Sequence, residues 1–299
     1  MQTPAVSVVI PNFNRAAVVL RAVESVLAQT LGDFELLIVD DASTDDSLQV
    51  LGTLTDPRIR VIAHESNRGA GAARNTGISE ARAAWVAFQD SDDYWLPEKL
   101  ERQMDLLNRP GSNLVAAYCG MLIEPMSGGG SRKTRYLPDH RISPREGQIL
   151  ESLLRDSFIS TQTLIVQRDV LVQIGGFDPD IPALIDWECM LRVAQKGPIG
   201  LVDEPLVHQR FSENSITRSA EKRLQARVFL VKKHESLLLR RPEILAAHDY
   251  AIAGAYRKLG DMANALHYLR EAIRLDPRRL KPRLMRAWLA FSPAAKIRA

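Results

Sequence analysis

Short apolar runs in the N-terminal part of the chain alternate with segments whose apolar residues recur at helical spacing. The runs are rich in Val, Ile and Leu and carry little charge, which is typical of strands buried on both faces. The intervening segments place apolar residues three and four positions apart, as Val19, Val23 and Val26 are, which predicts helices. The expected strands are 6–10, 34–39, 59–63 and 84–88, and the expected helices are 16–30, 43–54, 69–81 and 96–108.

This alternation predicts an α/β fold, in which a mostly parallel, doubly wound and Rossmann-like sheet is covered by helices on both faces. The pattern changes after residue 114, where strands and helices follow each other less regularly. Strands are expected at 114–123 and 158–167, helices at 145–157 and 186–197, and a Gly-rich basic loop at 125–135.

Strand signals stop at about residue 213. The remaining chain is rich in Ala, Leu, Lys and Arg, which favours helices. We therefore expect two domains, an α/β domain over residues 1–218 and an all-helical extension over residues 219–299.

Composition and charge narrow the class of protein. The chain has 299 residues, 45% of them hydrophobic and 25% charged, which are ordinary values for a globular protein. The net charge of +3 argues against a nucleic-acid partner. Two cysteines, Cys119 and Cys189, make neither a disulfide framework nor a zinc cluster. The N-terminus lacks a secretion-signal pattern and no apolar run approaches the roughly 18 residues that span a bilayer, so we expect a cytoplasmic protein.

Carboxylates gather where two of the expected strands end. Asp90, Asp92 and Asp93 in "FQDSDDYW" follow the strand at 84–88, and Asp40 and Asp41 follow the strand at 34–39. Carboxyl ends of parallel strands share one edge of a sheet, where ligands bind in such folds. The cluster is therefore either an acidic turn that caps the next helix or a site for a cation with an anionic ligand.

Four stretches resemble the family 2 glycosyltransferases, which have the GT-A fold. They are "VSVVIPNFNRAAVVLRAVESVLAQTLGDFELLIVDDASTDDS", "NRGAGAARNTGISEARAAWVAFQDSDDYWLPEKL", "TLIVQRDVLVQIGGFDPDI" and "DWECMLRVA". They occur in the family's order and together cover about residues 5–215. The resemblance implies transfer of a sugar from a nucleotide diphosphate sugar to a hydroxyl acceptor, assisted by a divalent cation, Mn²⁺ or Mg²⁺.

The resemblance also assigns roles at the donor site. "DSD" corresponds to the family's DxD motif, so Asp92 is expected to bind the metal and Asp90 to face the ribose or the metal's water shell. Asp93 is expected to cap the following helix or orient its neighbours. Asp40 is expected to contact the nucleotide base, and Asp41 to order the "DASTDD" turn.

Four further residues are expected around the donor. Pro11 shapes the turn after the first strand, and Asn14 either caps the next helix or contacts the donor. Arg74 meets a phosphate or the base, unless it is a surface residue. Arg210 is kept from the family pattern and can supply positive charge. Ser212 stands where relatives commonly have a His, so a third protein ligand for the metal is an open question.

The acceptor hydroxyl needs a general base, for which we expect Asp186 in "LIDWECMLR". Ile185 replaces the first acid of the family's acidic pair, and Glu188 is the alternative base. Asp186 can also act as an N-cap of its helix, and Trp187 either lines the sugar pocket or packs in the core. Direct displacement with one base implies inversion at the anomeric carbon. His208 is expected to support the metal or the leaving diphosphate, or to be structural.

Two features of the C-terminal segment bear on partners. Residues 255–277 resemble one tetratricopeptide unit, too few for an independent array, so we expect a hairpin docked on the catalytic domain or on a second subunit of a homo-oligomer. The basic stretch "LKPRLMRAWLAFSPAAKIRA" includes Trp288 and Phe291 and can lie at the inner face of a membrane, unless it packs on its own domain.

The family suggests surface polysaccharide assembly with a glycan or lipid-linked acceptor. The competing reading is a non-catalytic GT-A scaffold that binds a nucleotide sugar or acts through its helical tail. The departures at Ile185 and Ser212 keep that reading open.

Overall fold

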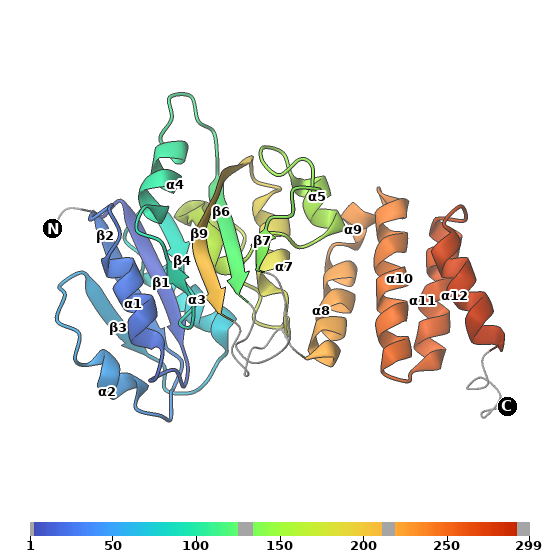
Figure 1. Cartoon of the computed structure of the whole chain (residues 1–299), viewed down its shortest axis with the longest axis horizontal. Helices are drawn as coiled ribbons and strands as arrows, with labels where there is room; N and C mark the ends of the chain where they lie inside the picture. Colours follow the sequence, from blue (N-terminus) through green and yellow to red (C-terminus); the bar gives the residue numbers. More distant parts are fainter. Residues whose placement is uncertain (1–2, 125–133, 211–218, 292–299) are drawn as a thin grey trace. The chain divides into compact units, whose positions relative to one another are not determined.

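The computed structural model describes residues 3–124, 134–210 and 219–291 (Figure 1). The chain divides into two compact units. The first unit comprises residues 1–180 and 185–215, and the second comprises residues 181–184 and 216–299. The domain boundary expected at residue 218 falls at the end of a segment outside the described residues and stays a prediction.

A nine-stranded sheet forms the centre of the first unit within the described residues, in the order β3-β2-β1-β4-β8-β6-β9-β5 with β7 paired to β6. β1 to β4 run parallel, whereas β8 is antiparallel to both β4 and β6. The parallel half therefore brings the carboxyl ends of β1, β2 and β4 to one edge. The strands are β1 Val6–Asn12, β2 Phe34–Asp40, β3 Ile59–Ala63, β4 Trp85–Phe88, β5 Tyr94–Trp95, β6 Ala116–Glu124, β7 Arg135–Leu137, β8 Leu164–Gln167 and β9 Ile199–Arg210.

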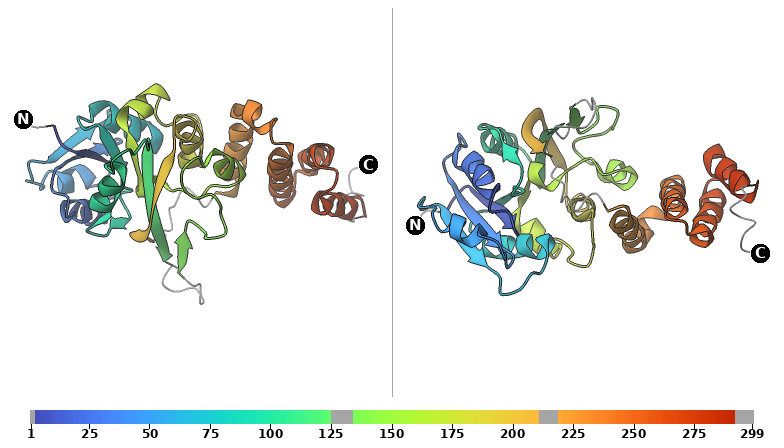
Figure 2. Two further views of the ribbon diagram at one scale, coloured as in Figure 1. Left: turned by 90° about the horizontal axis from the view of Figure 1, so that it is seen from above. Right: turned by 60° about the horizontal axis from the view of Figure 1, so that its bottom comes forward.

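Helices cover both faces of this sheet, as Figures 1 and 2 show. α1 and α4 bury apolar residues in one core with Val8, Ile10 and Leu36. α3 packs on the other face of β1, where a Cβ on Gly77 would lie 2.3 Å from Val9 Cγ1, so only glycine permits this close approach. The helices are α1 Val19–Leu27, α2 Ser47–Leu51, α3 Ala70–Glu80, α4 Lys99–Leu107, α5 Leu150–Arg155, α6 Arg168–Gln173 and α7 Ile185–Val193.

The expected α/β class is confirmed, and the differences are local. The strand expected at 158–167 splits into a 3₁₀ turn, η1 (Thr161–Thr163), and β8, because the Thr163 amide donates to the Ser160 carbonyl at 3.0 Å. The helix expected from residue 96 begins at Lys99, since Tyr94–Trp95 pairs with β9 immediately before it.

The second unit is all-helical, as expected. Its helices are α8 Ala220–Lys233, α9 Glu235–Leu238, α10 Pro242–Lys258, α11 Met262–Leu275 and α12 Leu280–Phe291. α10 packs against α8 and α11, and α11 packs against α12 (Figure 2). Ala253 and Leu269 are fully buried between α10 and α11. Gly260 turns the chain with φ +83°, and the Asp261 side chain caps α11. The hairpin expected over residues 255–277 is thus formed by the end of α10 and by α11.

Candidate active site

Asp40, at the carboxyl end of β2, is fully buried and forms hydrogen bonds to the end of the neighbouring strand β1. Its Oδ2 accepts hydrogen bonds from Asn12 Nδ2 at 2.8 Å and from the Ser43 hydroxyl at 2.7 Å. Its Oδ1 accepts the Ser43 amide at 2.9 Å. Both oxygens therefore already have partners within the chain, and Asn12 is the residue that Asp40 orients.

Pro11 and Asn14 lie on β1 and on the loop that follows it. Pro11 continues β1 opposite Val39, so the strand extends to Asn12 instead of turning at the proline. Asn14 has φ 52°, and its Oδ1 accepts the Thr44 amide at 2.8 Å. The cap of α1 is formed without a side-chain hydrogen bond, so the expected capping role of Asn14 is wrong. Asn14 instead ties the loop after β1 to the loop after β2.

Asp41 faces a different segment from the one we expected. Its carboxylate accepts the backbone amides of Arg68 at 2.9 Å and Gly69 at 2.7 Å. It also contacts His64 Nδ1 at 2.7 Å. Asp41 therefore orders the loop before α3, whereas Asp40 and Asn14 order the "DASTDD" turn.

Arg74 of α3 and Asp90, after β4, form an ion pair at 2.5 Å. Arg74 is buried, with 5% of its surface exposed, and its guanidinium lies 5.6 Å from the centre of the Phe177 ring. Its Nε and Nη1 have no hydrogen-bond partner within the described chain. Arg74 is thus not a surface residue, and its two remaining donors suit an anionic group such as a phosphate.

Asp92 lies beside the loop after β1, with its side chain 26% exposed. Arg15 Nη2 lies 3.6 Å from Asp92 Oδ2. A hollow of about 190 Å³ opens between Asp92, Asp45, Asn14 and Arg15. The next carboxylate, Asp93, is buried and accepts from Gln162 Nε2 at 2.9 Å.

Asp93 therefore orients its neighbours and does not cap α4, whose N-terminus carries no side-chain cap. The adjacent carboxylates Asp92 and Asp93 have separate surroundings, one partly open and one closed by protein. Only the partly open carboxylate is accessible to a ligand.

Asp186 lies in the first turn of α7, where its Oδ1 accepts the Trp187 amide at 2.8 Å. The helix begins at Ile185, so Asp186 is not its N-cap. Burial raises the pKa of Asp186 to about 6; the Arg74 charge opposes this shift and the Asp90 charge adds to it. The structure therefore brings Asp186, Arg74 and Asp90 close enough for their charges to interact, although they come from three separate segments.

The residues around Asp186 have structural partners. Glu188 is fully buried and binds Arg192 through both carboxylate oxygens, at 2.8 and 2.5 Å. Trp187 is buried and donates from Nε1 to the Leu153 carbonyl at 2.6 Å. Both Glu188 oxygens are thus paired with Arg192, and Trp187 packs in the core instead of lining a sugar pocket.

His208 and Arg210 both lie on β9. The His208 ring stacks on Tyr94, with centroids 4.9 Å apart, and its Nδ1 lies 3.2 Å from Glu124 Oε1. These contacts give His208 a structural role at the junction of β5, β6 and β9. The Arg210 side chain and Ser212 lie outside the described residues.

A divalent cation fits this arrangement only as a partly protein-bound ion. Among the residues that the structure describes, three or more His, Cys, Asp or Glu side chains nowhere converge on a metal-sized space. Mg²⁺ and Mn²⁺ accept one or two carboxylates when substrate phosphates and waters complete the shell. Asp92, a partly exposed hard-oxygen ligand with Asp90 two residues away, satisfies that requirement.

Sequence reasoning missed two polar residues at the same edge. Asn12 ends β1 and Gln89 follows β4, and both are buried. Asn12 Oδ1 and Gln89 Oε1 lack a hydrogen-bond partner among the described residues. Their place in the sequence, directly at strand ends of a parallel sheet, was the signal that could have identified them.

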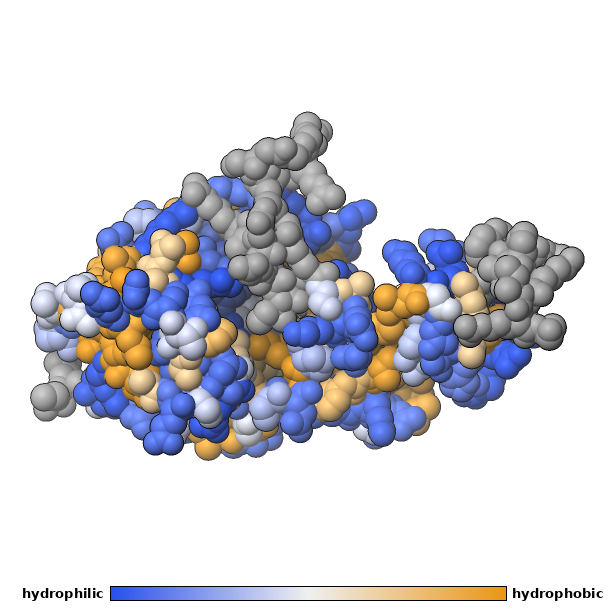
Figure 3. All heavy atoms as spheres, turned by 90° about the horizontal axis from the view of Figure 1, so that it is seen from below, coloured by the Kyte–Doolittle hydropathy of each residue, from blue (hydrophilic) through white to orange (hydrophobic). Residues whose placement is uncertain are grey.

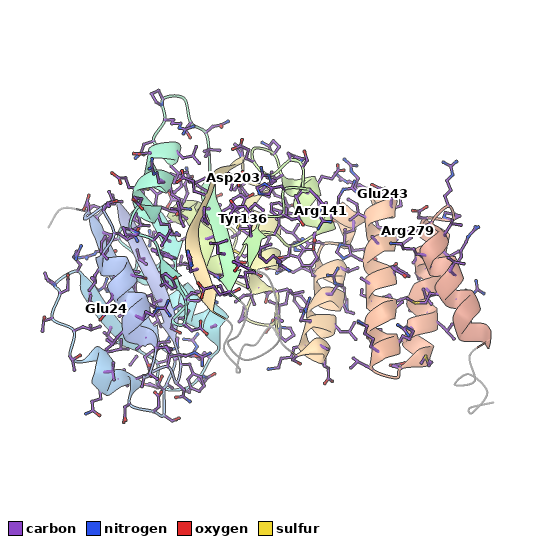
Figure 4. The ribbon with its side chains drawn as sticks, viewed as in Figure 1. Glu24, Tyr136, Arg141, Asp203, Glu243 and Arg279 are labelled. Carbon is purple, nitrogen blue, oxygen red and sulfur yellow. The ribbon has the colours of Figure 1, made fainter. Side chains whose placement is uncertain are left out.

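A second polar cluster lies on β7 and β9 (Figure 4). The Tyr136 hydroxyl donates to Asp203 Oδ1 at 2.6 Å, and Arg145 Nη2 lies 3.0 Å from Asp203 Oδ2. Burial and Asp203 raise the pKa of Tyr136 above its usual range. The cluster fastens β7 and the loop after it to β9, which is a structural function.

Residues 7–171 match the family model described as glycosyl transferase family 2. The putative teichuronic acid biosynthesis glycosyltransferase TuaG of Bacillus subtilis is 30% identical over 237 residues, covering 78% of this chain and 90% of that protein. The succinoglycan biosynthesis protein ExoO of Rhizobium meliloti is 40% identical over 114 residues, which cover 38% of this chain but only 33% of that protein.

Solved structures show the same fold at lower identity. The crystal structure of S. aureus TarS 1-349 has a TM-score of 0.65 at 19% identity, covering 91% of this chain and 81% of that one. The mannosyltransferase PcManGT from Pyrobaculum calidifontis, in complex with GDP-Man and Mn²⁺, has a TM-score of 0.60 at 18% identity, covering 99% and 83%. The fold is therefore GT-A, and the chain belongs to glycosyl transferase family 2 and is a glycosyltransferase.

Proposed function

We propose that this enzyme transfers a sugar from a nucleotide diphosphate sugar to an acceptor hydroxyl with inversion, and that Asp186 is the general base. The observation that carries the proposal is the charge cluster of Asp186, Arg74 and Asp90 at the edge where the parallel strands end. A carboxylate whose pKa is raised to about 6 still ionises near neutral pH but is a stronger base than an ordinary aspartate.

The proposed step is a single displacement. Asp186 takes the proton of the acceptor hydroxyl. At the same time the oxygen of that hydroxyl forms a bond to the anomeric carbon, and the bond from this carbon to the diphosphate breaks. The proton ends on Asp186, and the nucleoside diphosphate leaves with one more negative charge. The unpartnered Nε and Nη1 of Arg74 are suited to stabilise that charge, because buried donors aimed at developing charge need no reorganisation.

Other residues of the proposed donor site act as ligands or supports. Asp92 would bind Mn²⁺ or Mg²⁺, with Asp90 within reach of its water shell, and such an ion would supply charge neutralisation for the diphosphate. Asp40 would lie against the nucleotide base while its oxygens hold Asn12 and Ser43 at the same strand ends. Asn14 ties the loop beside Asp92 to the loop after β2, Pro11 continues β1 toward that loop, and Arg210 at the end of β9 adds positive charge.

The acceptor is proposed to be a glycan or a lipid-linked sugar in surface polysaccharide assembly. This rests on the names of TuaG and ExoO, which concern teichuronic acid and succinoglycan biosynthesis. The similar structures of TarS with UDP-GlcNAc and PcManGT with GDP-Man support a nucleotide sugar as donor. The sugar and the nucleotide are to be identified by experiment.

Asp186→Asn tests the proposed chemistry. The amide cannot take the proton, so turnover falls by roughly 10²- to 10⁴-fold, while the affinity for the nucleoside diphosphate changes little. Turnover and isothermal titration of the two proteins give both quantities, and exposed Asp180→Asn is the matched control. Normal turnover by Asp186→Asn would place the base elsewhere. A wild-type protein that binds donors without turnover would support the non-catalytic scaffold.

Charge is distributed very unevenly along the chain, and this supports a proposed localisation in the cytoplasm at the inner face of a membrane. Residues 216–299 hold 19 Lys and Arg against 7 Asp and Glu, a formal charge of +12, so the remaining residues carry −9. The whole-chain value of +3 conceals this split. Hydrophobic residues also reach the surface among hydrophilic ones in the helical second unit (Figure 3). Leu280 and Leu284 of α12 are each 67% exposed.

None of the described helices is long and apolar enough to span a bilayer. The proposed contact is peripheral and combines electrostatic attraction with insertion of the exposed leucines of α12. Each Lys or Arg near an anionic surface contributes about 1 kcal/mol. Cosedimentation with phosphatidylglycerol vesicles should be strong at low salt and lost with Leu284→Glu, whereas Leu259→Glu on the exposed end of the preceding hairpin is the control. Equal binding to neutral vesicles, or a concentration-dependent homo-oligomer without vesicle binding, would reject the membrane as partner.

A further inference from the structure

The segment that carries Asp90 and Asp92 is a tight turn. The Asp93 amide donates to the Asp90 carbonyl at 3.2 Å, which is the hydrogen bond that closes a four-residue β-turn. Ser91 and Asp92 are therefore the two central residues of the turn. The position of the Asp92 carboxylate thus depends on how firmly the two end residues, Asp90 and Asp93, are held.

Each end of the turn is held by side chains from other segments. At the first end, Arg74 of α3 forms an ion pair with the Asp90 carboxylate. At the second end, Gln162 Nε2 donates to Asp93 Oδ2 at 2.9 Å, and both residues are only 2% exposed. Gln89, which follows β4, donates from Nε2 to the Asp93 carbonyl at 2.9 Å. Buried side chains therefore fix both ends of the turn.

Gln162 binds this segment at two points. Besides the bond from its side chain to Asp93, its backbone carbonyl accepts the indole N–H of Trp95 at 2.9 Å. Trp95 is the second residue of β5, which directly follows the turn. One residue of η1 therefore fixes both the end of the turn and the strand that continues from it. Its side chain acts on the residue adjacent to Asp92.

The antiparallel direction of β8 brings Gln162 to this place. η1 immediately precedes β8, and β8 pairs with β4 so that Ile165 lies opposite Ala87. In an antiparallel pair, the start of one strand meets the end of the other. The start of β8 therefore meets the carboxyl end of β4, from which the turn emerges. A parallel strand at this position would place η1 at the opposite edge of the sheet.

The chemistry of the pair suits an amide at this position. A carboxylate only accepts hydrogen bonds, and its burial costs free energy unless donors meet it. Gln162 supplies a donor that carries no charge. It therefore holds Asp93 without adding a positive charge that would oppose a cation at Asp92.

We propose that Gln162 is a positioning residue that holds the turn so that Asp92 can bind a divalent cation. The inference rests on the proposed metal-assisted use of a nucleotide sugar. Gln162 acts through Asp93 and not by contact with the cation, because its hydrogen bond restricts the residue adjacent to Asp92. Loss of an outer partner that orients a metal-binding side chain typically costs about 10- to 100-fold in metal affinity.

The test measures how much Mn²⁺ strengthens nucleotide binding. Isothermal titration of UDP and of GDP, each with Mn²⁺ and with EDTA, gives two dissociation constants, and their ratio is the metal effect. Gln162→Met keeps an unbranched side chain of similar length but removes the donor. It should lower the metal effect by roughly 10- to 100-fold, or to none. Affinity in EDTA should change by less than about threefold.

Ser7→Ala is the matched control. It also removes a neutral donor from a buried carboxylate, because the Ser7 hydroxyl donates to Glu35 Oε1 at 2.6 Å. This pair lies near the amino ends of β1 and β2, away from the turn. Ser7→Ala should therefore lower the thermal midpoint and leave the metal effect unchanged.

A combined substitution tests the hydrogen bond itself. Gln162→Glu alone places two carboxylates against each other and should lower the metal effect at least as much as Gln162→Met. Gln162→Glu together with Asp93→Asn exchanges donor and acceptor at constant total charge, so the hydrogen bond can form again. The combined variant should recover the wild-type metal effect to within about threefold.

A metal effect that survives in Gln162→Met would overturn the inference, even if that variant is less stable. A loss that the combined substitution does not restore would overturn it too. If Gln162→Met does not fold, the combined variant decides, since a wild-type metal effect there supports the inference and a lost one overturns it. A wild-type protein on which Mn²⁺ has no effect would refute the proposed metal site, and the inference with it.

Discussion

Asp186→Asn should make the protein more stable at neutral pH while it removes activity. Burial raises the pKa of Asp186 from 3.8 to about 6. The folded protein therefore keeps this proton between pH 4 and 6, whereas the unfolded chain has lost it. Stability falls as pH rises through that window, and the whole cost is present above pH 6.

The size of the effect follows from the shift. About two pKa units correspond to at most roughly 3 kcal/mol, at 1.36 kcal/mol per unit. Asparagine resembles the protonated side chain and can still accept the Trp187 amide through its oxygen. The variant should thus gain up to roughly 3 kcal/mol at pH 7.5 and almost nothing at pH 4.

Urea unfolding of wild-type and Asp186→Asn at pH 4.5 and pH 7.5 measures this difference. Exposed Asp180→Asn, which also loses one negative charge, is the control and should show no comparable pH-dependent gain. A variant that is less stable than wild-type at pH 7.5, or a gain that is equal at both pH values, would refute the reasoning. Either result would mean that the ionised carboxylate is compensated in the folded protein.

Three further predictions concern other parts of the first unit. Burial lowers the pKa of Lys99 to about 8, so the unfolded chain holds this proton to higher pH and stability rises between about pH 8 and 10.5. Lys99→Met should remove the part of that rise due to Lys99, roughly 3 kcal/mol. Urea unfolding at a series of pH values measures it. Gly120→Ala should lower stability by about 1–3 kcal/mol, because its Cβ would lie 2.6 Å from the Glu204 carbonyl oxygen, whereas Gly254→Ala in open space should not; equal thermal midpoints would contradict this. Asp92→Ala should abolish the Mn²⁺-dependent part of nucleoside diphosphate affinity and leave the thermal midpoint of the free protein unchanged; a metal effect that survives in titration calorimetry would exclude Asp92 as the ligand.

The alternating half of the fold could be predicted because buried parallel strands have a compositional signature. Runs such as residues 6–10 place apolar residues on both faces of the sheet. Between these runs, α1 is amphipathic and α3 is rich in small residues. β5 could not be predicted, since two residues have no periodicity and Tyr94–Trp95 is a strand only through its pairing with β9. The antiparallel insertion of β8 is likewise a property of tertiary pairing.

The position of the candidate site could be predicted from the strand ends, but the contacts of each side chain within it could not. Consecutive residues at a strand end point in different directions, so adjacent carboxylates meet different loops. Asp40 holds Asn12, and Asp41 holds the loop before α3. Among the described residues, the oxygen of Asn12 is left without a partner because its amide nitrogen donates to Asp40, 28 residues away. Periodicity contains no information about either feature.

A metal-assisted single displacement with Asp186 as base determines the configuration of the first product. A panel of nucleotide diphosphate sugars with Mn²⁺ and an acceptor, followed by proton NMR, identifies the donor that is consumed and the anomeric coupling of the new bond. We expect inversion relative to the donor by the wild-type enzyme, and loss of the product signal with Asp186→Asn. Retention of configuration, or an undiminished product signal from Asp186→Asn, would contradict it.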